Sequence, residues 1–296
     1  MRAYKLFILL ILPCILIAQP SWQRSAELVK TEVELFHVSQ MPDLPTTETL
    51  QKGSFMYEIS HRFGSFNSGY QGMYGFDGPV TMRMALSYGV TNHLIATIGR
   101  SSLQDNLDIR LKLKALQVRS SSMPTVVALQ AGIAFNTESY AGLVKRKAFD
   151  SNSNQFYGQI IFNTMLLQKK LGIGIIPSVV YNSFIFANDY AANKKYTASI
   201  PVYTQYYFNR MWSIWTEYTP VVGGWKGNVF YDAADENKSH NSLSTGIAIG
   251  TGGHVFFLFA TNNSRLNPTQ YLVGAPASAD DRDAWRIAFC ITRELH

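Results

Sequence analysis

Leu107-Asp108-Ile109-Arg110-Leu111-Lys112-Leu113-Lys114-Ala115 is the stretch that decides the fold, because its odd positions are apolar and its even positions are charged. Successive side chains of a β-strand point to opposite faces, so this stretch predicts a strand with one apolar and one charged face. The same two-residue period recurs in Val80–Tyr88, Val127–Phe135 and Trp285–Thr292. In all we find about twelve such segments, near residues 53–63, 79–89, 93–101, 105–117, 125–136, 155–166, 171–182, 196–208, 212–222, 242–250, 254–262 and 284–293.

The lengths of these segments and of their connections indicate a membrane barrel. Segments of about 9–13 residues match a tilted membrane-crossing strand, whereas strands of soluble sheets usually have about 5–6 residues. The connections alternate between tight joints (90–92, 120–124, 168–170, 209–211, 251–253) and mostly long ones (64–78, 137–154, 183–195, 223–241, 263–283), with 101–105 as the short exception. We therefore predict an all-β fold, a transmembrane antiparallel up-and-down β-barrel of about 12 strands over residues 53–296, with short periplasmic turns and long outer loops.

A soluble β-barrel or sandwich is the alternative fold, because its strands alternate too. The face opposite the apolar one is mostly small and uncharged, as at Gly132, Ala134, Gly246 and Ala248, which suits a crowded lumen better than a solvated surface. Aromatic residues gather near strand ends, where membrane interfaces lie. Charged residues are 16% of the chain, against roughly 25% in an ordinary soluble domain. These features favour the membrane barrel.

The start of the chain predicts export. Arg2 and Lys5 precede an apolar run, Leu6–Ile17, that ends at Ala18. This is the pattern of a signal peptide over residues 1–18, and the run is shorter than the roughly 20 residues of a spanning helix. Cys14 follows Leu and Pro instead of small residues, so lipidation is the weaker interpretation. Export together with spanning strands predicts the outer membrane of a Gram-negative bacterium.

Residues 19–52 have a different composition from the barrel. Ala26–Phe36 allows a short helix, which Pro42 and Pro45 would end. Two interpretations stay open for this segment: a periplasmic linker, or a plug that occupies the lumen.

Charge and cysteine content exclude several classes of function. Of 26 basic and 20 acidic residues, the signal peptide removes two basic ones, which leaves 24 against 20 and a net charge of +4. This is too mild to argue for nucleic acid. Cleavage leaves Cys290 as the only cysteine, so no intrachain disulfide, Cys-based metal cluster or covalent haem site can form. We predict no cofactor.

Several ungapped words carry a resemblance to a known family. They are Ser60-His61-Arg62-Phe63-Gly64-Ser65-Phe66-Asn67-Ser68-Gly69, Tyr74-Gly75-Phe76-Asp77, Leu86-Ser87-Tyr88-Gly89-Val90-Thr91-Asn92, Ile98-Gly99-Arg100-Ser101-Ser102, and Gly253-His254-Val255-Phe256 with Thr261-Asn262. In these words the chain resembles an uncharacterised family of outer-membrane β-barrel proteins known only as a domain of unknown function. The resemblance spans essentially the whole mature chain, and it implies a barrel fold without a catalytic assignment.

The end of the chain departs from a common barrel ending. It closes on Arg293-Glu294-Leu295-His296 instead of on an aromatic residue. Recognition by the barrel assembly machinery, a partner that the barrel fold implies, would therefore rest on Trp285, Phe289 and Ile291.

Charged residues on the inward phase of the strands are the candidate site. If the apolar face contacts lipid, the lumenal wall carries Glu58, Arg62, Arg83, Asp108, Arg110, Lys112, Lys114, Glu217 and Arg286. The last strand closes against the first, so most of these residues form one basic sector. One interpretation is a lining that attracts a small anionic solute, because a low-dielectric passage focuses the field of like charges. The other is a salt-bridged ladder with Glu58, Asp108 and Glu217 that holds a small lumen shut.

Signals for metal binding and catalysis are weak. His61 lies on the apolar phase of its strand, and we expect it and His254 at the lipid–water interface or at a bulge, not on a metal. Asp280, Asp281 and Asp283 form an acidic run that we interpret as a solvated loop.

His240-Asn241-Ser242 has the spacing of outer-membrane phospholipases, but Ser242 falls on the lumenal phase, and only Asn262 is available to orient the histidine. We therefore predict that the protein is not an enzyme.

Three functions remain after these exclusions. The basic wall favours a narrow pore or transporter, and residues 21–52 with the long loops favour a structural or partner-docking barrel for a cell-surface or electron-transfer complex. Only the His240–Ser242 spacing supports an interfacial hydrolase. The expected partners are outer-membrane lipid, the barrel assembly machinery and a small anionic solute, and not nucleic acid.

Overall fold

The computed structural model describes residues 32–139, 147–183, 196–224 and 239–295. The barrel is formed by the second of two compact units, residues 33–296. The predicted signal peptide over 1–18 lies outside the described residues. Within the described ranges, no helix has both the length and the apolar character needed to cross a membrane.

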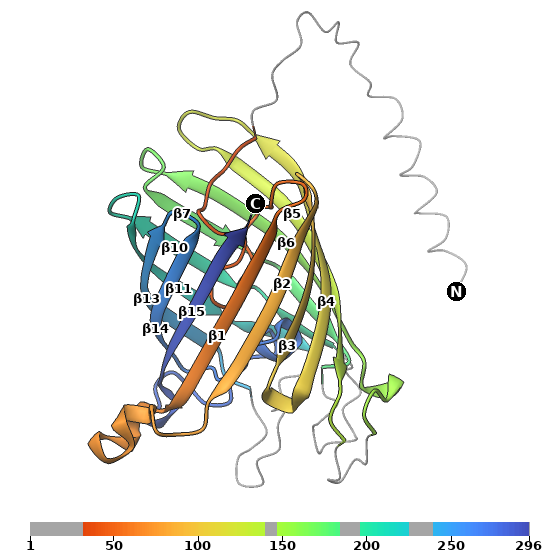
Figure 1. Ribbon diagram of the computed structural model, residues 1–296, viewed down its shortest axis with the longest axis vertical. Helices are drawn as coiled ribbons and strands as arrows, with labels where there is room; N and C mark the ends of the chain where they lie inside the picture. The colour runs from red at the N-terminus through yellow and green to blue at the C-terminus, as the bar shows by residue number, and fades with distance from the viewer. Residues whose placement is uncertain (1–31, 140–146, 184–195, 225–238, 296) are drawn as a thin grey trace, which may run out of the picture. The chain divides into compact units, whose positions relative to one another are not determined.

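Fifteen strand segments build the structure (Figure 1). They are β1 (Phe55–Ser65), β2 (Thr81–Thr91), β3 (Leu94–Ser101), β4 (Asn106–Val118), β5 (Thr125–Asn136), β6 (Gln155–Leu166), β7 (Leu171–Ile175), β8 (Ser178–Tyr181), β9 (Tyr196–Ser199), β10 (Val202–Tyr207), β11 (Trp212–Thr219), β12 (Val221–Gly224), β13 (Ser242–Thr251), β14 (His254–Thr261) and β15 (Arg286–Leu295). The helical pieces are η1 (Phe66–Ser68), η2 (Tyr70–Gly75), η3 (Leu103–Asp105), η4 (Ser151–Ser153), α2 (Pro268–Tyr271) and η5 (Arg282–Ala284).

Three prolines explain why fifteen segments make twelve strands. Pro177 separates β7 from β8, Pro201 separates β9 from β10, and Pro220 separates β11 from β12. A proline has no N–H for the ladder, but its carbonyl still accepts. The ladder therefore continues across the breaks: Ile176 N–H donates to Pro201 O at 2.8 Å and Ile200 N–H donates to Pro220 O at 3.2 Å. Each pair of segments is one spanning strand, and the predicted count of about twelve is confirmed.

The sheet closes on itself. Every pairing is antiparallel, β6 pairs with both β5 and β7, and β1 pairs with both β2 and β15. The register at the closure places Ile59 opposite Ile291. The result is a twelve-stranded antiparallel barrel in which the last strand meets the first, as the sequence predicted.

The turns divide the barrel into two ends. At the end that we call the short-turn end, tight turns join β2 to β3, β6 to β7, β10 to β11 and β13 to β14, and the described chain begins and ends there. The opposite, long-loop end carries the β1–β2 and β14–β15 connections. In Figure 1 the short-turn end is uppermost.

The side-chain phase of the strands is the predicted one. On β4, Ile109, Leu111 and Leu113 are between 43 and 52% exposed on the outer surface, whereas Asp108, Arg110 and Lys112 are at most 5% exposed. Small residues on the inner phase leave room for rings from neighbouring strands: a Cβ on Gly132 would overlap the Tyr157 ring, and one on Gly174 would overlap the Tyr203 ring. The side chains at these inner positions are small because the rings of neighbouring strands fill the space beside them.

Residues 33–50 form a hairpin inside the lumen, which we call the lumenal hairpin. Its tip is the turn Met41-Pro42-Asp43-Leu44, closed by the Met41 N–H on Leu44 O at 2.9 Å, with Pro42 supplying the fixed φ that such turns favour. Thr46 N–H donates to Ser39 O at 3.2 Å across the arms. In Figure 1 the hairpin is the red segment that enters the barrel from the short-turn end.

The described part of the expected helix over 26–36 is not helical. Residues 32–36 carry no helix, because the Leu35 and Phe36 N–H groups donate to Glu48 Oε1 on the other arm, at 2.8 and 3.3 Å, instead of to carbonyls one turn back.

The β14–β15 connection fills the lumen from the other side. We expected residues 263–283 as an outer loop, but their first half folds inward, and all four residues of α2 are buried. Leu266, Leu272 and Val273 are at most 4% exposed. Burial of these apolar side chains stabilises the inward fold, and a solvated loop would leave them in water.

Candidate functional site

Eight of the nine predicted wall residues lie buried in the lumen, and the ninth lies half-buried at its rim. Glu58, Arg62, Arg83, Asp108, Arg110, Lys112, Lys114 and Glu217 are all at most 5% exposed. Arg286 begins β15 at the long-loop end and is half-buried. The partners of these side chains divide them into two sets.

The first set is paired within the wall. Arg83 on β2 forms ion pairs with Glu58 on β1, at 3.5 Å, and with Asp108 on β4. Arg110 approaches the other oxygen of Glu58 at 3.7 Å. These four residues form part of the salt-bridged ladder that was one of the two sequence interpretations, and their charges neutralise one another. The third carboxylate expected in that ladder, Glu217, instead accepts from the Leu44 N–H.

The second set is paired with the lumenal hairpin. Arg62 Nη2 lies 2.6 Å from Asp43 Oδ1 at the tip. Lys112 Nζ donates to the carbonyls of Ser39 and Thr46, at 2.6 and 3.0 Å. Lys114 Nζ lies 3.4 Å from Glu48 Oε2. Three wall cations therefore depend on the hairpin for their partners.

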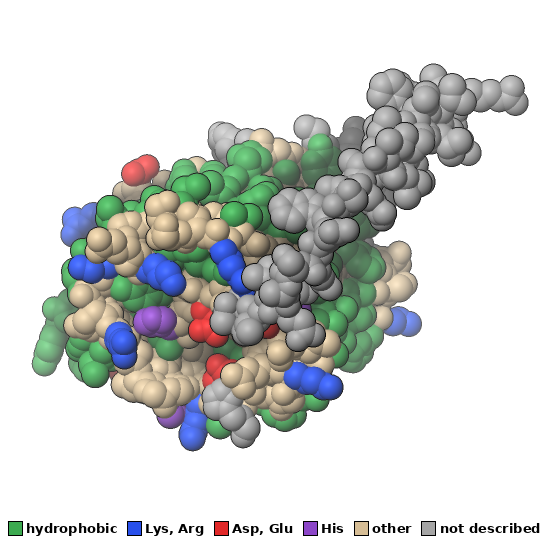
Figure 2. Space-filling model, turned by 90° about the horizontal axis from the view of Figure 1, so that it is seen from above, with side chains coloured by type: hydrophobic (Ala, Val, Ile, Leu, Met, Phe, Trp, Pro, Cys, Tyr) green, Lys and Arg blue, Asp and Glu red, His purple; other side chains and the backbone are tan. Residues whose placement is uncertain are grey.

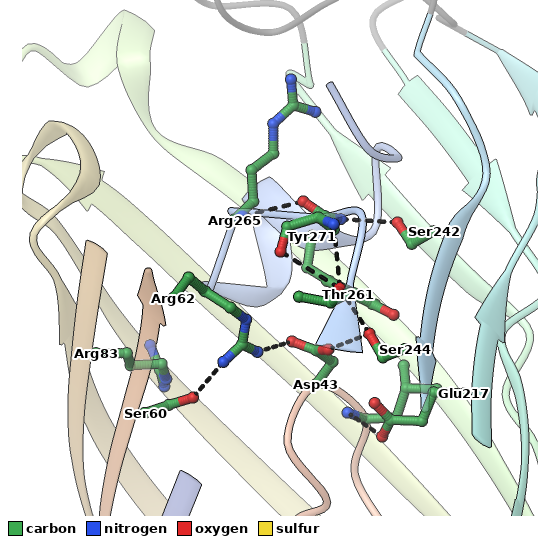
Figure 3. A network of polar contacts seen from close by, with 12 residues as sticks. Asp43, Ser60, Arg62, Arg83, Glu217, Ser242, Ser244, Thr261, Arg265 and Tyr271 are labelled. Atoms are coloured by element: carbon green, nitrogen blue, oxygen red, sulfur yellow. Dashed lines mark hydrogen bonds and ion pairs between the residues drawn. The ribbon is translucent and has the colours of Figure 1, made fainter. Parts of the chain in front are cut away.

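The hairpin tip is held by a network of polar contacts in the lumen (Figure 3). Asp43 accepts from Ser244 Oγ at 3.1 Å as well as from Arg62, and the Leu44 N–H donates to Glu217 Oε1 at 3.2 Å. Arg62 also donates to Ser60 Oγ at 2.7 Å and lies 4.6 Å from the centre of the Phe259 ring. Side chains of β1, β11 and β13 thus hold one turn between them.

The formal charge of the buried wall residues balances only with the hairpin in place. The eight buried wall residues comprise five cations and three carboxylates, a surplus of two positive charges. Asp43 and Glu48 on the hairpin supply two negative charges. A buried charge without a partner is costly, so this match is a reason for the hairpin to dock where it does.

The β14–β15 connection closes the lumen at the long-loop end. Asn267 contacts Arg83, and its Nδ2 donates to Asn106 O at 2.9 Å. Gln270 Nε2 donates to Leu103 O at 2.9 Å, and the Tyr271 hydroxyl lies 3.2 Å from Thr219 Oγ1. These contacts bind the connection to β2, β4 and β11, so the lumen is occupied from both ends.

A cavity of about 740 Å³ opens at the short-turn end. Both arms of the hairpin line it, and so do the β10–β11 and β13–β14 turns with the last residues of β15. Figure 2 views this end: basic side chains lie around the rim, and most of the acidic side chains in view lie nearer the centre. The hairpin is therefore accessible from this end of the barrel, where its arms leave the lumen.

Reasoning from sequence missed the counter-ions and the second closing segment. Asp43 and Glu48 lie in the segment that had two open interpretations, and Asn267 lies in a loop expected outside. The available signals were the Pro-Asp turn at the tip and the apolar run Tyr271-Leu272-Val273 in an otherwise polar loop.

The two strand histidines lie on the outer surface. The His61 ring packs 4.6 Å from the Phe289 ring, next to the register shift between Arg62 and Ser65. The His254 ring stacks on Phe256 at 5.9 Å. Among the described residues, no group of three His, Cys, Asp or Glu side chains is placed to hold a metal ion. Asp283 instead accepts from Asn67 on the neighbouring loop.

The His240–Ser242 spacing does not produce a catalytic pair in the hydrogen bonds observed. Ser242 is fully buried on the lumenal side and accepts from Asn263 Nδ2 at 2.7 Å. His240 pairs through its backbone with Ala275. Asn262, the residue expected to orient the histidine, donates to the Asn241 and Ala277 carbonyls, both at 3.0 Å.

Comparison with known proteins identifies the fold and no activity. A family model described as a membrane bound beta barrel domain (DUF5777) matches residues 36–295. No curated protein sequence matches the chain. Among solved structures, the chain is similar to the NanC porin (10% identity, TM-score 0.47, 82% of this chain and 99% of that one) and to an outer membrane channel from Pseudomonas putida F1 (11%, 0.48, 86% and 99%). It is also similar to the outer membrane phospholipase A of Escherichia coli (10%, 0.39, 87% and 95%), and likeness at these levels carries no functional argument.

Proposed function

Because the chain belongs to this family of membrane-bound β-barrel domains, we propose that it is an outer-membrane barrel that conducts a small anionic solute when both the lumenal hairpin and the inward part of the β14–β15 connection are displaced. The observation that supports this proposal is the division of the wall cations. Arg83 and Arg110 have carboxylate partners on the wall, whereas Arg62, Lys112 and Lys114 have their partners on the lumenal hairpin.

Displacement of the hairpin would leave the wall with a surplus of positive charge. The ladder of Glu58, Arg83, Asp108 and Arg110 would stay paired, while Arg62, Lys112 and Lys114 would face water. A narrow passage with low-dielectric walls focuses the field of such charges and favours anions. A twelve-stranded barrel lies between the filled eight-stranded type and the water-filled sixteen-stranded porins, so the passage would be narrow.

The β14–β15 connection sets the design of the conductance test. Since it occupies the lumen from the long-loop end, deletion of the hairpin alone is not sufficient to open the passage. We propose three proteins in planar bilayers: the full chain, a variant without residues 33–49, and that variant with residues 264–274 replaced by a short Gly-Ser linker. Conductance should be smallest in the first and largest in the third.

Selectivity tests the charge argument separately from opening. In the doubly opened variant, Lys112→Glu with Lys114→Glu should reverse the sign of the reversal potential across a salt gradient, because lumenal substitutions tune selectivity. Arg100→Gln is the matched control, since Arg100 forms its ion pair with Asp105 on the exposed surface, and it should leave the potential unchanged. An unchanged reversal potential after the lysine substitutions would show that the wall does not select the ion.

A structural or partner-docking barrel is the second candidate, and closure of the lumen from both ends favours it. If the doubly opened variant folds and does not conduct, the pore is rejected and docking remains. In that case the cavity at the short-turn end, with the hairpin arms on its wall, would be the surface presented to a periplasmic partner.

Catalysis and location complete the proposal. We propose no enzymatic activity, because Ser242 is engaged with Asn263 inside the lumen. We place the short-turn end in the periplasm, following the usual orientation of such barrels, and expect the barrel assembly machinery to insert the chain. Outer-membrane fractionation with slower migration on gels after boiling would support this location, and recovery as a soluble periplasmic protein would reject it.

A further inference from the structure

The β1–β2 connection carries an unusual concentration of exposed apolar side chains. Phe66, Tyr70, Met73, Tyr74 and Phe76 are between 44 and 81% exposed, and Asp77 is the only charged residue between positions 66 and 78. Loops that face water seldom keep so many large apolar side chains exposed together. We call residues 66–78 the aromatic loop. Figure 1 shows it projecting outward from the rim of the barrel at the long-loop end, next to β1.

The aromatic loop is folded and not merely extended. η1 and η2 lie within it, and the Tyr74 N–H donates to Gly69 O at 2.8 Å. Its base is tied to the β15 side: the Phe66 N–H donates to Trp285 O at 2.8 Å, and Ser65 Oγ donates to Asp283 O at 2.8 Å. The apolar side chains are therefore held outward by the fold before any partner arrives.

Glycines make the base of the loop possible. Gly75 has φ +96°, and a Cβ there would overlap the Gly64 carbonyl, where the loop crosses back over β1. The chain can therefore close this loop tightly only with glycine at position 75.

The apolar surface of the loop is continuous with the lipid-facing surface of the barrel. The Phe76 ring packs 4.6 Å from Phe63 on β1, which lies 5.9 Å from Phe289 on β15. Within the loop, Phe66 stacks on Tyr74 at 5.1 Å. Rings thus run without interruption from the outer wall of the barrel onto the loop.

We propose that the aromatic loop lies in the interfacial region of the lipid leaflet at the long-loop end and anchors that rim of the barrel to the lipid. Its continuity with the membrane-facing wall, its outward direction and its aromatic and methionine composition fit a lipid interface, where amphipathic rings are favoured. A second copy of the chain or an extracellular protein would instead cover the loop with protein.

Depth measurement by spin labelling tests the proposal in the full chain carrying Cys14→Ser, reconstituted in phospholipid bilayers. A nitroxide at Gln71→Cys reports on the loop and leaves all five apolar side chains in place. Arg282→Cys, exposed on η5 at the same end, is the aqueous control, and Ile109→Cys on the outer face of β4 is the lipid control. Cys290 is fully buried and should not compete for the label.

We expect the label at position 71 to collide more often with oxygen than with a water-soluble nickel complex. Its ratio of oxygen to nickel collisions should be higher than that of Arg282→Cys and closer to that of Ile109→Cys. Tyr70→Ser with Met73→Ser should move the label toward the Arg282→Cys ratio, and Gly75→Ala should do the same by opening the base of the loop. An aqueous ratio at position 71 in the unaltered loop overturns the proposal. So does spin–spin broadening, which would indicate a second copy, or shielding from both quenchers, which would indicate a protein partner. None of these measurements depends on conductance.

Discussion

Asp43→Asn is the sharpest test of the docked hairpin, because it removes one charge from the tip and keeps the size of the side chain. Asp43 and Arg62 are both buried, and Arg62 Nη2 lies 2.6 Å from Asp43 Oδ1. The substitution therefore leaves the Arg62 guanidinium without its ion-pair partner while the hairpin stays docked. Removing one partner of a buried pair costs about 3–5 kcal/mol. Glu217 accepts a hydrogen bond from the adjacent Leu44 and gives Arg62 a second nearby carboxylate, so we expect the lower end, about 3 kcal/mol.

The cost falls on hairpin docking and not on the barrel ladder, since Arg62 regains water when the hairpin leaves. At 1.4 kcal/mol for each tenfold change, the population of the released hairpin should rise on the order of 100-fold. Hydrogen exchange measured by mass spectrometry in lipid nanodiscs reports this directly. The Leu35, Leu44 and Thr47 N–H groups donate to Glu48, Glu217 and Asn163, and their protection should fall by that factor while protection of β4 and β5 is unchanged.

Asp105→Asn is the matched control, because it breaks an ion pair with Arg100 in which both side chains are about half exposed. Such pairs contribute about 0–1 kcal/mol, so hairpin protection should not change. Arg62→Met in the Asp43→Asn background should restore part of the protection by removing the unpaired cation. Unchanged exchange in Asp43→Asn, or an equal loss in hairpin and strands, would refute the hairpin as a separately docked unit.

Three further predictions concern pH, phase and packing. Partial desolvation lowers the pKa of His37, which lines the open cavity with its ring 4.6 Å from Tyr207. Docking therefore favours neutral His37, is strongest above the ordinary histidine pKa and weakens as pH falls below it. Hairpin exchange should accordingly rise on acidification, and this dependence should be lost in His37→Gln. A lipid-soluble thiol reagent should label Ile109→Cys and not Arg110→Cys in a Cys290→Ser background, and faster labelling at 110 would reverse the assigned faces. Gly174→Ala should lower the free energy of unfolding of the barrel by about 1–3 kcal/mol, because the added Cβ would overlap the Tyr203 ring. Gly158→Ala should cost less, since the added Cβ would meet only Val179, at 4.0 Å. Equal shifts in melting temperature for the two variants would contradict the packing argument.

The sequence by itself determined the barrel and the direction of each side chain. A strand has a two-residue period fixed by its own backbone, so the alternation in 107–115 places Ile109 outward and Arg110 inward whatever the neighbours are. The strand count survived the breaks at Pro177, Pro201 and Pro220, because each proline interrupts one strand without turning the chain. The even number of strands allows β15 to close antiparallel on β1.

The tertiary structure alone decided what each lumenal charge touches. Asp43 and Ser244 are 201 residues apart in the chain, and Leu44 and Glu217 are 173 apart, so no local pattern relates them. Their meeting depends on the register of all twelve strands and on which segments enter the lumen. The periodicity identified a basic wall, but whether Lys112 faces water or the Ser39 carbonyl depends on the hairpin, because a cation without wall partners binds whatever acceptor the fold brings to it.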